Sequence, residues 1–457
     1  MVSRLRLSLA AFLVAIVGLV GQALTFDYSY AISQYDEWAH IDYTVRLADG
    51  EIPVWGDKLD QRTLGIVDCI GAHWTPPGDC GRTTRDPLSA PALGYSYQAQ
   101  QGPLGYVASA VVWRGLNLEV RPADRQLQLL RVGNAVTALL VAAFLALLMG
   151  ALARTYGAAL AGTALVIASP ALVASVAYVN NDLSAVAAGL FIALVGVWAA
   201  STPHIADARF WLPVAAGFLS GIALGLTKVT AVGVPLTFLI YWFLSRRSER
   251  LRRRLGFTVA GAQLFGAALA ALAFAMWQSQ RSAVESRIVM SALQGTSKAD
   301  NVPVDAVFAG IWDSVGALIG RGLVASPLRE VSIAVLVVAG VGAFAVVAGA
   351  LTKTSGTRAS HLFNVQRLGV ALIVTVVASA VGWVTYGYVW DGYGIPLPFR
   401  YLTPLVPLAA VVALPFFERI GRWSWVYAVG VTLSTIFFSG DFDQFVFNTS
   451  FILQGIV

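Results

Sequence analysis

Apolar side chains follow one another in long uninterrupted runs, not in the narrow stripes of helices that face water on one side. Each run is close to the roughly 20 residues that an α-helix needs to cross a ~30 Å hydrocarbon layer. The pattern predicts an all-α polytopic membrane protein, a single membrane-embedded domain over 1–457 with about eleven transmembrane helices. The predicted spans are 7–25, 132–151, 157–178, 183–200, 210–227, 229–244, 257–277, 331–351, 368–386, 400–416 and 423–439.

Composition agrees with a lipid environment. Hydrophobic residues make up 57% of the chain and charged residues only 12%, whereas soluble domains carry roughly a quarter charged residues. The net charge of +6 would suggest nucleic acid as a partner of a soluble protein, but six arginines fall within the short segment 246–254. That cluster is better explained as a topology signal and a contact for anionic lipid headgroups.

Positive charge in the short loops predicts the orientation. With the N terminus in the cytoplasm, these charges collect on the inner side: Arg4, Arg6, Arg154, Arg209, the 246–254 cluster, Lys353, Arg358, Arg367, Arg419 and Arg422. The large loops 26–130 and 278–330 and the tail from about 440 then lie outside. The first run is expected to remain as a helix because no clear signal-peptidase site follows it. The amino-acid composition, rich in Ala, Val, Gly and Arg, is compatible with a high-GC bacterium. The expected location is therefore a bacterial plasma membrane.

The first outer loop is too long to be a mere connector. A helix is predicted over Tyr35–Leu47 with Ser33 as its cap, and the apolar stretch 102–113 is expected to lie in the membrane interface. The second loop is expected to add a helix near 303–320. Together they predict a platform above the bundle.

The two cysteines, Cys69 and Cys80, bracket a Pro/Gly-rich part of this loop. On an oxidising face such a pair predicts a disulfide. A metal site that also uses His73 or Asp79 is the alternative, but these residues do not complete a tetrahedral set.

Chemistry is predicted where the first outer loop begins. In a helix, Asp36, His40 and Tyr43 share one face at i, i+4 and i+7, and Glu37 lies beside them. That face carries a carboxylate, an imidazole and a phenol. The simpler alternative is that Asp36 and Glu37 only complement the helix dipole.

Further polar residues begin otherwise apolar spans on the same side. They are Asn180, Asn181, Asp182, Lys228, Arg400 and Tyr401. Each alone can be a snorkelling anchor at a helix end. Together they predict two acids and two cations around one outer cavity, an arrangement suited to an anionic headgroup and to deprotonation of a hydroxyl.

Short motifs across the chain resemble the GT-C superfamily of integral membrane glycosyltransferases. They are Asp36-Glu37, Gln101-x-Pro-Leu-x-Tyr106, Asn181-Asp182, Gly225-Leu-Thr-Lys228 and Arg400-Tyr-Leu-x-Pro-x-x-Pro407. The resemblance implies a polyprenyl-phosphate-linked sugar donor, reaction on the outer face, inversion of the anomeric centre and a catalytic base in the first loop. Only about 18 residues follow the last predicted span. The expected acceptor is therefore a lipid-linked or cell-envelope glycan and not a folded protein.

These expectations assign a role to each residue. Asp36, assisted by Glu37, is the expected base, and Arg400, Lys228 and Tyr401 are the expected donor-phosphate contacts. The expected substrate contacts are His40, Tyr43, Gln101, Asn181 and Asp182. No metal is expected to be obligatory, although Asp182 near the two acids could hold a divalent cation.

A transporter or flippase of a lipid-linked saccharide is the alternative function, because it too needs an outer cavity with cations. Transport requires polar residues near the midplane of several spans. The predicted spans are filled with Ala, Val, Leu, Gly and Phe, which favours an enzyme whose site lies at the outer interface. A purely structural scaffold is the third alternative.

Overall fold

Helices make up the architecture, seen here in a computed structural model. The structure describes residues 3–25, 32, 36–72, 77–78, 80, 86–201, 207–245, 250–282, 304–309, 311, 344–348, 364–391 and 399–436. Within these ranges there is no β-strand, only two isolated bridges that join residue 32 to 72 and residue 58 to 95. The predicted all-α membrane fold is thus confirmed at the level of fold class.

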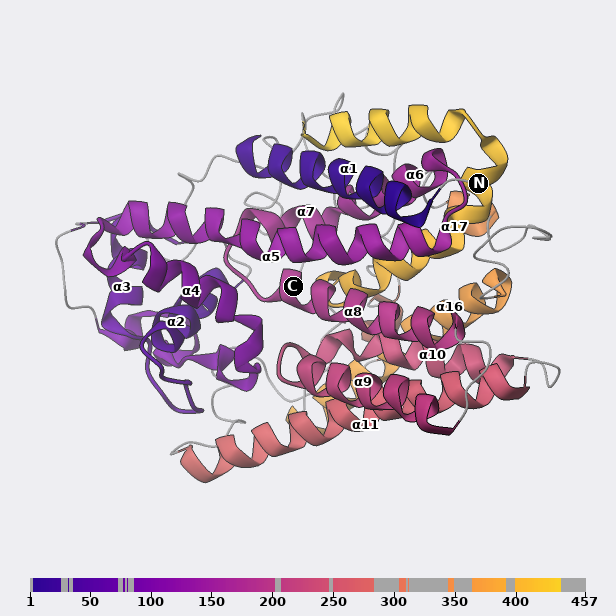
Figure 1. Cartoon of the computed structure of the whole chain (residues 1–457). Coiled ribbons are helices and arrows are strands. Elements are labelled where there is room, and N and C mark those ends of the chain that lie inside the picture. Colours follow the sequence, from indigo (N-terminus) through magenta and orange to yellow (C-terminus); the bar gives the residue numbers. More distant parts are fainter. Residues whose placement is uncertain are drawn as a thin grey trace.

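One bundle of long helices forms most of the molecule (Figure 1). Its members are α1 (Arg4–Thr25), α5 (Ala123–Leu152), α6 (Tyr156–Ile167), α7 (Pro170–Ala177), α8 (Asp182–Ser201), α9 (Asp207–Gly225), α10 (Gly233–Leu244), α11 (Arg250–Arg281), α16 (Val365–Tyr386) and α17 (Val406–Ile420), with a further helix over 423–436. A large cluster of Leu, Val, Ala and Ile side chains from these helices forms the core.

Six of these helices are long and apolar enough to cross a membrane, and three shorter apolar helices lie among them. The chain is therefore a multi-pass membrane protein. The predicted run 157–178 is not one continuous helix, because the structure breaks it into α6 and α7 at Ser169-Pro170. Proline lacks the amide hydrogen and clashes with the preceding turn, so it begins a new helix there. Of the run 331–351, only 344–348 lie within the described ranges, and a count of eleven stays a prediction.

Close backbone contact joins α9 to α11. A Cβ placed on Gly221 would lie 2.1 Å from the carbonyl oxygen of Gln263, and one on Gly225 would lie 2.5 Å from that of Ala267. Lipid gives helices no hydrophobic reason to associate, so small residues that let backbones approach supply packing instead. This spacing of glycines therefore decides which helix α9 packs against.

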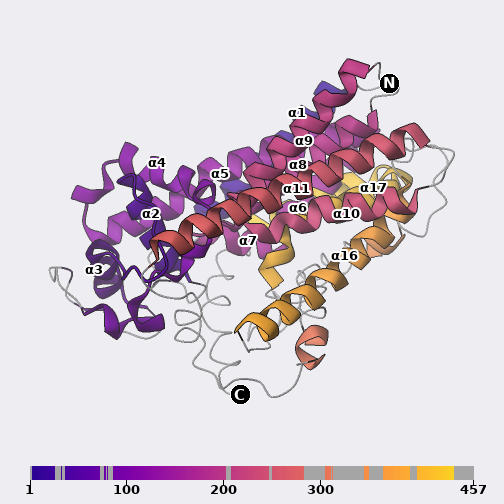
Figure 2. The same cartoon turned by 90° about the horizontal axis from the view of Figure 1, so that it is seen from below.

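A separate helical unit covers one end of the bundle, and we call residues 36–72 and 86–122 the cap. It contains α2 (Glu37–Ala48), α3 (Gln61–Ile70), α4 (Val107–Gly115) and the short helices η1 (Pro87–Ser89), η2 (Pro91–Gly94), η3 (Tyr97–Gln100), η4 (Pro103–Gly105) and η5 (Leu118–Val120). The cap has its own core, built around the buried side chains of Trp38, Tyr97 and Trp113. Figure 2 shows the cap at the end of the bundle that lies away from the N terminus.

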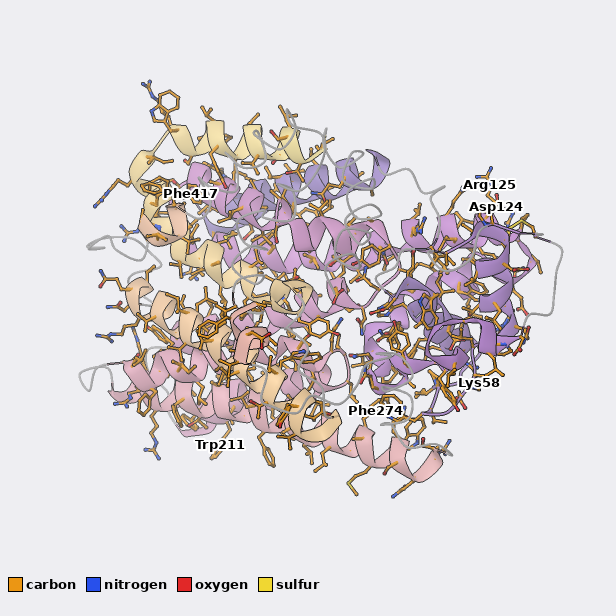
Figure 3. The ribbon with its side chains drawn as sticks, turned by 180° about the vertical axis from the view of Figure 1, so that it is seen from behind. Lys58, Asp124, Arg125, Trp211, Phe274 and Phe417 are labelled. Atoms are coloured by element: carbon orange, nitrogen blue, oxygen red, sulfur yellow. A yellow bond between two sulfur atoms is a disulfide. The ribbon has the colours of Figure 1, made fainter. Side chains whose placement is uncertain are left out.

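Helix α5 begins at Ala123, within the predicted outer loop 26–130 and before the predicted span 132–151. The extra turns are amphipathic. Leu127 and Leu130 are buried in the core of the cap, while Arg125 is exposed. In Figure 3 Arg125 lies at the cap end of the molecule and Phe417 lies far along the bundle. The polar residues at 123–131 belong to the same helix as the span, which therefore links cap and bundle rigidly.

The end of α11 also holds the cap. The buried amide of Gln278 donates to the carbonyls of Pro53 and Ala99, both at 2.9 Å, and accepts from the amide of Trp55 at 3.2 Å. Ser282 donates to the carbonyl of Trp55 at 2.6 Å. Two helices far apart in sequence, α5 and α11, thus fix the position of the cap on the bundle.

Cys69 at the end of α3 forms a disulfide with Cys80, 11 positions further along the chain. Closing a loop of this length restricts the unfolded chain by about 3 kcal/mol on the loop-entropy estimate. We expect the Cys69→Ser/Cys80→Ser variant to lose stability by up to that amount, measured by thermal unfolding of the full chain in detergent. A reductant should destabilise the wild type equally and leave the double variant unchanged; a wild type indifferent to reductant would contradict this prediction.

Candidate functional site

The first turn of α2 differs from its prediction. The helix begins at Glu37, two positions later than expected, and Asp36 is its N-cap residue in the left-handed conformation, with φ 67°. The side chain of Asp36 makes no capping hydrogen bond. The predicted cap, Ser33, lies outside the described residues. Asp36 therefore does not cap the helix through its side chain, although both acids lie at the N-terminal end of α2, where they complement the helix dipole.

Glu37 lies in a buried ion pair that the sequence analysis did not predict. Arg131 of α5 donates from Nε to one carboxylate oxygen at 2.8 Å and from Nη2 to the other at 2.7 Å. The amide of Val179 donates to the same carboxylate at 2.9 Å. Glu37 and Arg131 are 0% and 2% exposed. Arg131 lies between the predicted loop 26–130 and the predicted span 132–151, and the sequence analysis gave it no role.

The segment between α7 and α8 is also held by α5. Asn134, one turn after Arg131, donates to the carbonyls of Val176 and Tyr178 at 3.4 and 2.7 Å. Asn180 accepts from the amide of Asp182 at 2.7 Å and so fixes the start of α8. The predicted polar cluster at the start of this span is therefore an ordered network.

The positive charge of Lys228 is balanced by a neighbouring carboxylate. Its ammonium group donates to Asp182 at 2.5 Å and to the side-chain oxygen of Asn181 at 2.9 Å. It also lies 4.9 Å from the ring centre of Tyr401. The expected grouping of Asn181, Asp182, Lys228 and Tyr401 is thus present, but the lysine pairs with the aspartate and is not a separate cation.

His40 and Tyr43 meet Tyr106 of the cap. The phenol of Tyr106 lies 2.8 Å from Nδ1 of His40, and its ring stacks on that of Tyr43 with 4.0 Å between centres. Tyr43 donates to the carbonyl of Gln101 at 3.0 Å. His40 and Tyr43 thus lie together as predicted. Gln101 and Tyr106, the two ends of the motif Gln101-x-Pro-Leu-x-Tyr106, complete this group.

The environment of Tyr106 shows which groups come together. Burial raises the pKa of the Tyr106 phenol well above its ordinary value. The neighbouring phenol of Tyr43, the carboxylates of Asp182 and Asp36, and the phenol of Tyr401 raise it further. Residues 36, 43, 182 and 401 therefore lie near Tyr106, at the junction between cap and bundle.

The segment that carries Gln101 packs directly on the turn before Lys228. The amide of Leu104 donates to the carbonyl of Leu226 at 3.0 Å, and Ser184 of α8 donates to the carbonyl of Gly105 at 2.9 Å. A Cβ on Gly102 would lie 2.1 Å from the carbonyl oxygen of Leu226. The motifs Gln101–Tyr106 and Gly225–Lys228 are thus in contact, because Gly102 has no side chain to keep the two backbones apart.

We expect Gly102→Ala to push this segment away from the turn at Leu226 and to destabilise the protein by about 1–3 kcal/mol, the usual cost of overpacking. Gly115→Ala is the matched control, because a Cβ at Gly115 would meet no atom within 4 Å. Thermal unfolding of both variants tests this, and equal stability of the two would refute the close contact.

The cap contains a second buried carboxylate that the sequence analysis passed over. Asp42 accepts from Ser96 at 2.6 Å, from the amide of Asp60 at 2.7 Å and from Arg46 at 3.2 Å. Burial raises the pKa of Asp42, an effect that the nearby Arg46 opposes. Its partners all belong to the cap. We therefore assign it to the structure of the cap, and the i, i+4 spacing of Asp42 and Arg46 was the available signal.

The four carboxylates near the junction differ in access. Glu37, Asp42 and Asp182 are each at most 1% exposed, and each contacts a cationic side chain. Asp36 is partly exposed. Among these four, Asp36 is the carboxylate that is not fully buried.

A divalent cation would have to compete with resident cations. Within the ranges that the structure describes, no group of three or more His, Cys, Asp or Glu side chains is arranged to hold a metal ion. Glu37 and Asp182 already pair with Arg131 and Lys228. The side chain of Arg400 lies outside what the structure describes, as do His73 and Asp79, and only the backbone of Arg400 is placed, in η10 (Phe399–Leu405).

Searches of this chain against protein-family models, curated proteins and solved structures find no match.

Proposed function

We propose that this protein is an inverting glycosyltransferase that moves a sugar from a polyprenyl-phosphate donor to a lipid-linked or cell-envelope glycan. The reaction takes place at the junction between cap and bundle, on the outer face of a bacterial plasma membrane. The proposal rests on the resemblance to the GT-C superfamily and on the geometry of the junction.

The accessibility of Asp36 carries the proposal. It is the partly exposed carboxylate at a junction where the other three are buried beside cations. It lies near Tyr106 of the cap, and Asp182 at the start of α8 lies near the same phenol. A general base must be reachable by the hydroxyl that it deprotonates, and its carboxylate must be available to accept a proton.

The reaction needs one displacement. The acceptor hydroxyl attacks C1 of the sugar from the face opposite the phosphate, and its proton passes to the Asp36 carboxylate as the new C1–O bond forms. The bond between C1 and the phosphate oxygen breaks, and its electron pair leaves with the polyprenyl phosphate. A single displacement of this kind inverts the anomeric centre.

Charge on the leaving phosphate must be stabilised. Lys228 shares its charge with Asp182, so it contributes less than a separate cation would. Arg400, on η10 just before Tyr401, is assigned the larger role in phosphate binding. Tyr401 and Gln101, which are partly exposed, are assigned as sugar contacts, and the buried His40, Tyr43 and Asn181 support them from behind.

The orientation that this function requires is eleven spans with the N terminus inside, so that the cap faces outward. We expect cysteines introduced into the arginine-rich segment 246–254 to resist labelling by a membrane-impermeant reagent in intact cells, because positive loops stay in the cytoplasm. Cysteines placed at exposed cap positions, such as Arg114, should be labelled. The reverse pattern would overturn the orientation.

The proposed function is tested by transfer in vitro. Purified protein is incubated with polyprenyl-phosphate arabinofuranose, mannose, glucose or galactose and a bacterial lipid extract, and the products are read by mass spectrometry. We expect one donor to yield a glycolipid heavier by one sugar and free polyprenyl phosphate. Movement of an intact lipid-linked saccharide across vesicles, with no transfer from any donor, would favour the flippase instead.

A further inference from the structure

We propose that Glu37 and Arg131 are positioning residues, not acid–base groups, and that their ion pair holds Asp36 where it can act as the base. The inference rests on the proposed function. It replaces the expectation that the two neighbouring acids share the proton of the acceptor.

The contacts of Glu37 leave its carboxylate fully engaged. Both oxygens accept from the Arg131 guanidinium, at 2.8 and 2.7 Å, and one also accepts from the amide of Val179 at 2.9 Å. Two parallel N–H···O bonds of this kind are strong and fix the carboxylate in direction as well as in distance. A proton on Glu37 would break this pair and leave the guanidinium buried without its counter-charge, which is costly.

The pair joins the cap to the bundle at the residue next to Asp36. Glu37 is the first residue of α2, and Arg131 lies on α5, 94 positions along the chain. Consecutive Cα atoms are about 3.8 Å apart across a trans peptide, so fixing Glu37 leaves the backbone of Asp36 little freedom. The carbonyl of Asp36 accepts from the amides of Ala39 and His40, at 2.9 and 3.2 Å.

The conformation of Asp36 needs such support. A non-glycine residue in the left-handed region costs of order 1–2 kcal/mol and persists only where surrounding contacts enforce it. Asp36 has φ 67° there, directly before the clamped residue. Strained residues of this kind often occur at functional sites, where the surrounding structure holds a side chain in one direction.

The same face of α5 orders the other half of the site. Asn134 holds the carbonyls of Val176 and Tyr178, and Val179 itself contacts Glu37. Three residues later Asp182 begins α8 and binds Lys228. The Glu37–Arg131 pair is therefore the contact through which Asp36 and the Asp182–Lys228 pair are kept in register.

A double-mutant cycle tests this assignment. The variants are Glu37→Gln, Arg131→Met and the two combined, assayed for transfer from the donor that the wild type uses, with kcat and KM separated and a pH–rate profile for each. Replacing a buried ion pair by uncharged residues is often tolerated, whereas removing one partner is not. Arg125→Met is the control, because Arg125 is exposed on the same helix.

If the pair positions Asp36, Glu37→Gln, Arg131→Met and the combined variant each lose at least about tenfold in kcat with KM little changed, and the two single losses do not add in the combined variant. The acid limb of the pH–rate profile, which reports the base, should stay in place in the combined variant. Arg125→Met should match the wild type. Size-exclusion chromatography and thermal unfolding identify any single variant that fails to fold, and the combined variant then carries the test.

Opposite results separate the two proposals. A loss in Glu37→Gln far larger than that in Arg131→Met would show that Glu37 itself takes part in the chemistry, and so would a shifted acid limb in a folded variant. Full activity of both single variants would show that the pair positions nothing. A wild type that transfers no sugar from any donor would instead overturn the proposed function, and this inference with it.

Discussion

Asp36→Asn is expected to lower sugar transfer by about 10²–10⁴-fold, the usual loss when a general base is removed. Asparagine has nearly the same shape as aspartate, but its amide accepts no proton at neutral pH. It also tolerates the left-handed conformation that residue 36 adopts, so the fold should be retained. The measurement is turnover of purified protein at saturating donor.

Two controls make this result specific. Thermal unfolding and donor binding should be close to those of the wild type, since Asp36 makes no capping bond that the amide would lose. Asp42→Asn, within the cap, should lower stability before it lowers turnover, because Asp42 is bound by Arg46 and Ser96. If Asp36→Asn keeps more than about a tenth of the wild-type rate, the base lies elsewhere and Asp182 is the next residue to test.

Lys228→Met is expected to have the second large effect, a loss of about 3–5 kcal/mol in the free energy of unfolding. Asp182 is 1% exposed and Lys228 3% exposed, so removing the ammonium leaves a carboxylate buried without its counter-charge. Thermal or denaturant unfolding in detergent measures the loss. Transfer should fall as well, since Asp182 lies next to the point where the sugar is proposed to bind.

The combined variant Asp182→Asn/Lys228→Met should recover most of this stability, because no unpaired charge is then buried. Lys58→Met is the matched control. Lys58 donates to the carbonyl of Leu93 at 2.7 Å and lies over the ring of Tyr95, on the outside of the cap. It should cost no more than about 1 kcal/mol. Equal losses at Lys58 and Lys228 would contradict the buried ion pair.

What the sequence determined by itself was everything that depends on local chemistry. Membrane spans were predictable because the cost of placing a residue in lipid is set largely by that residue and its near neighbours along the helix. The Cys69–Cys80 pair lies within one loop and could be predicted for the same reason. The proximity of Asp36, His40 and Tyr43 followed from the helical period, and only the first turn was misplaced, because a left-handed residue at a helix start leaves no clear trace in the sequence.

The tertiary structure decided the burial and pairing of the polar residues. Glu37 finds Arg131 across 94 positions, and Lys228 finds Asp182 across 46. No sequence period relates residues so far apart. The adjacent acids Asp36 and Glu37 were therefore predicted to act together, and Lys228 was predicted to be a separate cation. Burial and ion pairing depend on which helices pack together, which glycines such as Gly102 and Gly221 permit at close range. Only the folded chain could therefore distinguish Asp36, which is partly exposed, from Glu37, which is buried against an arginine.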